Sequence, residues 1–196
     1  MKKSDFTKDR IIKESSILFN TQGYKSTSLS EITEACGYTK GAIYRHFENK
    51  EALEIESLDY MSKLVMLTLN EKIKNRTNVF EKLYAILDFY CSYTNNPIIK
   101  GGCPLLNTAI EVDETDSVLR LKAKYFLDTI KRAIEKILIN GVKHNQLKPE
   151  INIEETVVVI IASLEGAIMM SKLNNNNMDI KLVTKHLKRH LEIYKI

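Results

Sequence analysis

Apolar residues recur at helical spacing through nearly the whole chain, and this periodicity constrains the fold more than any other feature. Between Ser117 and Val142, for example, one broad apolar stripe is formed by Leu121, Tyr125, Ile130, Ile134, Ile137 and Leu138. No segment of appreciable length alternates as a half-buried strand would. Three Pro and seven Gly in 196 residues leave few breaks for helices. We therefore predict an all-α protein.

Helix-capping residues divide the N-terminal part of the chain into short helices. Thr7 is placed to cap a first helix that ends near Gly23. Ser28 and Glu31 have the spacing of a capping box, in which the hydroxyl and the carboxylate each accept a backbone N–H at the helix start. Gly37 can adopt the left-handed conformation that ends the second helix.

Two further capping residues follow directly. Thr39 is expected to cap a third, short helix that ends around His46 and Phe47, and Asn49 a fourth that runs from Lys50 to about Lys74. Three short helices joined by tight turns are what a helix-turn-helix requires. Gly41 keeps the leading edge of the third helix slim, which suits entry into the major groove of DNA.

The rest of the chain predicts five more helices. They are expected at Val79–Tyr93, from Pro104 onward, at Ser117–Val142, at Glu154–Leu173 and at Ile180–Tyr194. Glu154–Leu173 is apolar almost all round, so it must be buried on most sides. Its most apolar run, Val157–Met170, is expected to be too short to span a bilayer and contains Glu165.

Composition and charge fit a soluble protein with an anionic partner near its N-terminus. The formal net charge is +4, and Met1–Lys50 holds nine Lys and Arg against six Asp and Glu. The N-terminus lacks the apolar core of a signal peptide. Cys36, Cys91 and Cys103 have no spacing typical of a zinc site or a disulfide framework. We expect a cytoplasmic protein that uses no cofactor or metal.

A continuous block within the first 53 residues resembles a known family. It comprises Asp9–Tyr24 (DRIIKESSILFNTQGY), Thr27–Ile32 (TSLSEI) and Gly37–Leu53 (GYTKGAIYRHFENKEAL). The last stretch contains the pattern Tyr-x-His-Phe-x-x-Lys with a following Leu. The block is similar to the DNA-binding domain of TetR/AcrR-type repressors, whose fold is an N-terminal helix-turn-helix domain followed by a helical effector-binding body.

The resemblance implies a DNA-binding surface by position. Thr39, Lys40 and Gly41 match family residues that address bases and nearby phosphates, and Thr27, Tyr44, His46 and Lys50 match those that hold the phosphate backbone. Ser28 is included in this surface, although we interpret it mainly as a helix cap. The chain departs from the family pattern at Thr33, where Ala is common, and at Tyr38, where Val is common.

The resulting hypothesis is a repressor released from a palindromic operator by a small molecule. Residues 1–50 would bind DNA, and residues 51–196 would bind the effector and form a homodimer through Ser117–Val142 and Glu154–Leu173. Residues expected to line the effector site, besides their contribution to the core, are Tyr90, Tyr93, Cys103, Asn107, Phe126 and Met169.

Several alternatives stay open at this stage. Cys103, at a helix start, is either a small packing residue or a reactive thiol. His186 and His190 have a spacing that can bind metal, but without a third ligand a solvated helix face is favoured. A small helical enzyme would need a nucleophile motif or a phosphate-binding loop, and a non-specific DNA-binding protein a stronger basic charge.

Overall fold

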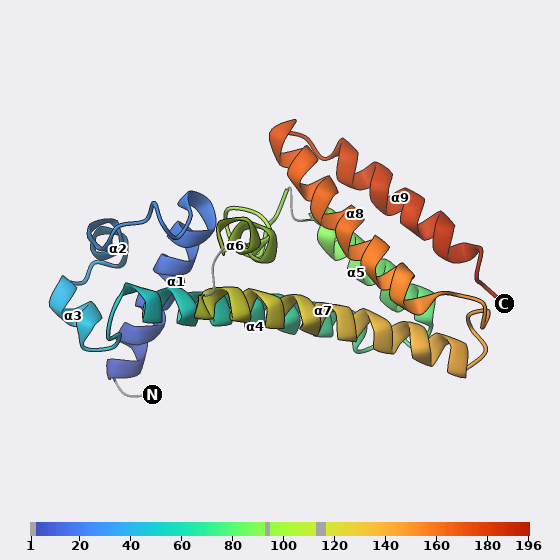
Figure 1. The fold of residues 1–196 in the computed structure, drawn as a ribbon, viewed down its shortest axis with the longest axis horizontal. Helices are drawn as coiled ribbons and strands as arrows, with labels where there is room; N and C mark the ends of the chain where they lie inside the picture. Colours follow the sequence, from blue (N-terminus) through green and yellow to red (C-terminus); the bar gives the residue numbers. More distant parts are fainter. Residues whose placement is uncertain (1–2, 93–94, 113–116) are drawn as a thin grey trace. The chain divides into compact units, whose positions relative to one another are not determined.

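The computed structural model describes residues 3–92, 95–112 and 117–196, and these residues form an all-α fold (Figure 1). The helices are α1 (Lys3–Gln22), α2 (Leu29–Cys36), α3 (Lys40–Tyr44), α4 (Lys50–Ile73), α5 (Val79–Ser92), α6 (Pro104–Val112), α7 (Val118–Lys143), α8 (Ile153–Leu173) and α9 (Met178–Glu192). The chain divides into two compact units. The first comprises Met1–Leu64 and Ile98–Phe126, and the second Val65–Pro97 and Leu127–Ile196.

Most helix boundaries lie within a residue or two of the predicted positions, with two corrections in the first unit. Thr7 is not a cap, because α1 already begins at Lys3 and places Thr7 in its second turn. Asp5 lies in the first turn, where its carboxylate complements the positive end of the helix dipole. Helix α3 ends at Tyr44, before His46 and Phe47.

The core of the first unit includes side chains of α1 and α2 and of the turn between α3 and α4. Ile11, Phe19, Ile32 and Phe47 are almost completely buried. Phe19 also stacks on Tyr24 with ring centres 5.0 Å apart. Burial of each large apolar side chain contributes about 1.5–3 kcal/mol, so these contacts fix the short helices that could not persist alone.

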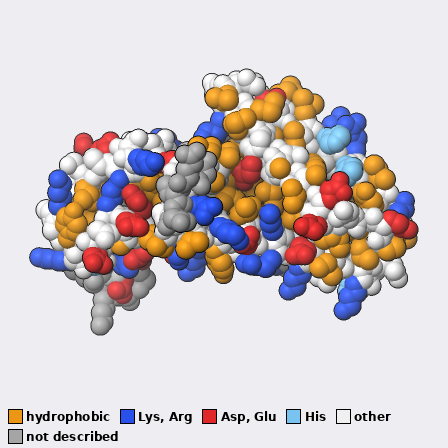
Figure 2. Space-filling model, viewed as in Figure 1, with side chains coloured by type: hydrophobic (Ala, Val, Ile, Leu, Met, Phe, Trp, Pro, Cys, Tyr) orange, Lys and Arg blue, Asp and Glu red, His pale blue; other side chains and the backbone are white. Residues whose placement is uncertain are grey.

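The second unit has α8 at its centre, packed against α9 and α5. One face of α8 is buried, including Ile160, Leu164 and Ala167. The helix is 21 residues long, and by length and composition alone it could cross a membrane, which corrects the expectation that its apolar run is too short. Because its inner face packs inside the unit, we interpret α8 as a core helix. Apolar side chains also reach the surface along α8 (Figure 2).

The apolar stripe predicted on α7 is divided by the fold. Ile130, Ile134 and Leu138 are buried within the chain's second unit. Leu121 and Tyr125, in the part of α7 that belongs to the first unit, are 62% and 64% exposed. The stripe is therefore largely used inside the chain, which leaves less of it for contact with a second copy than the sequence suggested.

Candidate nucleic-acid interface

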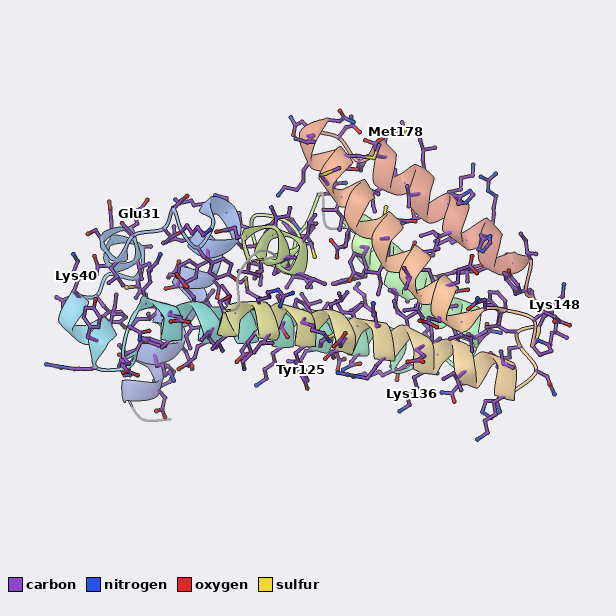
Figure 3. The ribbon with its side chains drawn as sticks, viewed as in Figure 1. Glu31, Lys40, Tyr125, Lys136, Lys148 and Met178 are labelled. Atoms are coloured by element: carbon purple, nitrogen blue, oxygen red, sulfur yellow. The ribbon has the colours of Figure 1, made fainter. Side chains whose placement is uncertain are left out.

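Helix α2 has the cap and the ending that its sequence predicts. Glu31 N donates to Ser28 Oγ over 3.2 Å, and Ser28 N donates to the Glu31 carboxylate over 2.7 Å. Glu31 is labelled in Figure 3. The Ser28 backbone N–H holds the pKa of Glu31 below its usual value, with help from the Ser28 hydroxyl. At the other end Gly37 adopts a φ of 73°, and its N–H donates to Thr33 O. This left-handed residue turns the chain sharply into α3.

Helix α3 presents its polar face outward. Thr39 caps the helix, since Ala42 N donates to its Oγ1 over 3.2 Å. Ile43 is buried and anchors the inner face, while Tyr44 is 50% exposed. Lys40 and Arg45 are exposed, and Lys40 extends into solvent (Figure 3). Within the part of the chain that the structure describes, neither cation forms an ion pair.

Gly41 has no packing reason to be glycine. A Cβ atom at this position would meet only Thr39 Oγ1, at 3.9 Å. The backbone φ of Gly41 also lies outside the left-handed region. Neither packing nor backbone conformation within the chain therefore requires glycine at this exposed position of α3.

Three other predicted DNA-binding residues already have partners inside the unit. Thr27 is buried, and its hydroxyl donates to Gly23 O over 2.7 Å. The Lys50 ammonium donates to Tyr24 O over 2.5 Å. His46 is partly buried with its ring 6.3 Å from that of Phe47. Their phosphate contacts stay predictions, and in the free chain Thr27 and Lys50 hold the turn between α1 and α2.

A second polar cluster, which the sequence analysis missed, joins α6 to the end of α1. The Asn107 amide donates to Asn20 O and Asn20 Oδ1, over 2.9 and 3.0 Å, and to Gly101 O. Asn20 in turn donates to the carbonyls of Lys100 and Gly102. Gly101 has a φ of 112°, and a Cβ there would lie 2.2 Å from Asn20 O, so this close approach requires glycine.

The same face of α6 also holds the turn between α1 and α2. Glu111 accepts from Tyr24 N over 2.8 Å and from Lys25 N over 3.2 Å. The Tyr24 hydroxyl lies 2.9 Å from Thr108 Oγ1, which itself donates to Pro104 O. Burial raises the pKa of Tyr24 well above its usual value. We call this set of contacts, made by Asn107, Thr108 and Glu111, the α6 latch.

A cleft of about 330 Å³ lies beside the α6 latch. Its lining includes Lys50, Glu54 and Glu111. Lys50 Nζ lies 3.2 Å from Glu54 Oε1. Burial raises the pKa of Glu54, although the ammonium of Lys50 opposes the shift. The exposed lining of the cleft is more apolar than polar, and none of the residues predicted to bind an effector lines it.

The residues predicted to bind an effector are divided between the two units. Cys103, Asn107 and Phe126 belong to the first unit, and Tyr90 and Met169 to the second. Tyr93 lies outside the described residues. Cys103 and Tyr90 are buried, whereas Met169 is 46% exposed. The Asn107 amide is used by the α6 latch, so its role in this structure is to position α6.

The described residues contain no cluster of three His, Cys, Asp or Glu side chains that could hold a metal ion. His186 and His190 stack with ring centres 6.5 Å apart, and the rings of His190 and Tyr194 meet in a T-shaped contact with centres 5.7 Å apart. Both histidines lie on α9, and Tyr194 follows the end of this helix.

Comparisons with known proteins agree with this organisation. The family model for bacterial regulatory proteins of the tetR family matches residues 11–56, and the tetracyclin repressor-like C-terminal domain matches residues 79–187. A TetR transcriptional regulator of Chloroflexus aurantiacus has a similar crystal structure, with a TM-score of 0.95 and 32% identity, covering 100% of this chain and 98% of that one.

Two named relatives match along most of their length. The transcriptional regulator YxaF of Bacillus subtilis is 27% identical over 186 residues, which cover 92% of this chain and 93% of YxaF. The transcriptional repressor DhaR of Mycobacterium sp. strain GP1 is 22% identical over 177 residues, covering 86% and 84%. The chain belongs to the TetR family of DNA-binding, helix-turn-helix transcriptional regulators, and is not an enzyme.

Proposed function

We propose that the protein is a cytoplasmic, homodimeric repressor that binds a palindromic operator and is released by a small-molecule effector. The observation that carries the DNA-binding part is the outer face of α3. Thr39, Lys40, Gly41 and Tyr44 share this face, and neither packing nor an ion pair within the described chain accounts for Lys40 or Gly41. Lysine at the leading end of a recognition helix is suited to guanine acceptors in the major groove.

Repression, rather than activation, is proposed from the relatives. DhaR, which matches most of this chain, is named a repressor. A dimer bound across an operator blocks a promoter by occupying it, and this requires no further surface for contact with other proteins.

The proposed dimer uses α8 together with α9. On α8 the side chains of Val158, Met169, Met170 and Leu173 are 45–79% exposed, and Ala162 is also exposed. Met178 and Leu182 extend this apolar surface onto the start of α9, where Met178 is labelled in Figure 3. We call these seven residues the α8–α9 face. A second copy of the chain would remove it from water.

This proposal keeps the α8 part of the predicted dimer and replaces α7 by α9. The reason is the burial of the α7 stripe within the chain. Gly166 also lies on α8, and a Cβ added there would meet nothing within 4 Å, so two α8 helices could approach closely at this point. Dimerisation would place two recognition helices about 34 Å apart, in successive major grooves.

We propose that the effector acts through the α6 latch. Asn107, Thr108 and Glu111 hold α6 to the end of α1 and to the turn that precedes α2. A ligand that binds better when α6 is displaced would favour the state with displaced α6, in which the DNA-binding helices are oriented differently. The size of this population shift is set by the ligand's difference in affinity for the two states.

Selection of DNA from a random library by the purified full-length chain tests the proposal. We expect a palindromic consensus whose half-sites lie about one helical turn apart, and loss of preference at one symmetric position in Lys40→Ala. Retention of DNA without any consensus would indicate non-specific binding and would contradict the proposal.

A further inference from the structure

Arg10 and Tyr38 form a pair at the turn between α2 and α3. Arg10 lies on the exposed side of α1, and its guanidinium carbon is 5.8 Å from the centre of the Tyr38 ring. Its Nη2 atom is 3.9 Å from the position that a Cβ would take at Gly37. The guanidinium is therefore held at the turn that leads directly to Thr39 and the recognition helix.

Arg10 has no acidic partner among the residues that the structure describes, 3–92, 95–112 and 117–196. Three other cations of the same unit do have acidic partners, namely Lys8 with Glu56, Lys50 with Glu54 and Lys122 with Asp59, whereas Arg10 resembles Lys40 and Arg45 in having none among the described residues. The Tyr38 ring thus orients the Arg10 guanidinium, while no described carboxylate uses its N–H donors for an ion pair.

The Tyr38 ring explains how this orientation is obtained. A guanidinium within about 6 Å of an aromatic face is attracted by the ring quadrupole, and stacking leaves the edge of the guanidinium plane available. Tyr38 is only partly buried, so its ring is not required to complete the core. A valine at this position would offer no face to the cation.

We propose that Arg10, oriented by Tyr38, is a further DNA contact that binds a backbone phosphate beside the site read by α3. The inference rests on the proposed DNA-binding function. A guanidinium can donate two parallel hydrogen bonds to a phosphate, which makes it a stronger and more directional partner than an ammonium. The contact comes from α1, so it adds to affinity and register but not to base readout.

The test measures the dissociation constant of the full-length protein for its selected operator across a salt series. Arg10→Ala should weaken binding roughly tenfold and lower the slope of log Kd against log salt by about one. Lys13→Ala is the matched control, because Lys13 is an exposed cation three residues along α1 with no described ring partner. It should leave both quantities near the wild-type values. Thermal melts of each variant monitor folding.

A double-mutant cycle tests the role of the ring. Tyr38→Val should weaken binding in the wild-type background and have no additional effect in Arg10→Ala. The inference is overturned if Arg10→Ala behaves like Lys13→Ala, or if Tyr38→Val costs the same affinity with and without Arg10. The Lys40→Ala variant distinguishes failure of the proposed Arg10 contact from failure of the proposed DNA-binding function. If Lys40→Ala loses specificity while Arg10→Ala binds as wild type, only the Arg10 contact is wrong.

Discussion

At Gly41, the stability of the chain and its affinity for DNA are expected to change in opposite directions. Gly41→Ala adds a methyl group that meets no close neighbour in the chain and lowers the entropy of the unfolded state. The free energy of unfolding should rise by about 0.4–1 kcal/mol. The same methyl group should obstruct α3 in the major groove, so operator affinity should fall. Urea denaturation and a gel shift on one preparation check both parts, and unchanged affinity would exclude close approach at this residue.

Glu31 links the capping box to pH. Its pKa is lowered in the folded protein, so the cap stabilises the chain above the unfolded pKa of about 4.3 and this contribution is lost as the pH falls through the lower folded pKa. We expect the stability difference between wild type and Glu31→Ala to be constant near neutral pH and to shrink on acidification. Urea denaturation over a pH series measures it. A difference that is the same at pH 7 and in acid would contradict the carboxylate cap.

Capping residues were the part of the sequence that predicted local structure best. Ser28, Glu31, Gly37, Thr39 and Asn49 act through atoms within three or four residues, and all five behave as predicted. The prediction that Thr7 caps α1 was wrong, because nothing in the local sequence prevented the helix from starting earlier. The partners of Lys50 and Asn107 could not be predicted, since Tyr24 and Asn20 are brought to them only by the tertiary fold.

Among the helices, α6 offers the clearest test of how a signal reaches the DNA-binding part. Glu111→Ala removes the acceptor of the Tyr24 and Lys25 amides. We expect faster hydrogen exchange in the segment 23–26 and a loss of about 1–3 kcal/mol in the free energy of unfolding.

Ile110→Ala is the control for the α6 latch, because Ile110 is a neighbour on α6 whose side chain is 64% exposed. It should change neither quantity appreciably. Equal exchange rates at residues 23–26 in wild type and Glu111→Ala would show that α6 does not hold this turn.

Helix α8 shows what periodicity can and cannot predict at the scale of an element. Its apolar sequence predicted burial on most sides, whereas within the chain only one face of α8 is buried and apolar side chains of another face are exposed. Ile160 and Ala167 lie on the buried face, which packs against α5 and α9, and Val158 and Met169 lie on the exposed face. Periodicity alone did not distinguish these two faces. That distinction depends on which helices surround α8, and this is decided by the tertiary fold.

For the whole molecule, assembly depends on the α8–α9 face. Ala162→Glu or Met169→Glu would place two like charges in the proposed interface, so either should yield a monomer with weak operator binding. Ile139→Glu is the matched control, because Ile139 is 47% exposed on α7. Sedimentation at micromolar concentration measures the outcome. If Ile139→Glu were monomeric while the α8 variants stayed dimeric, the interface would lie on α7 and the proposal would be wrong.

The central claim is that two recognition helices of one dimer read a specific DNA site. The most direct measurement compares the affinity of the full-length protein for two DNA duplexes at one fixed salt concentration. One duplex is the selected operator, and the other has the same length and composition but scrambled half-sites. We predict a ratio of about 10³ or more, with two chains bound per operator duplex. Equal affinity for the two duplexes would contradict the claim.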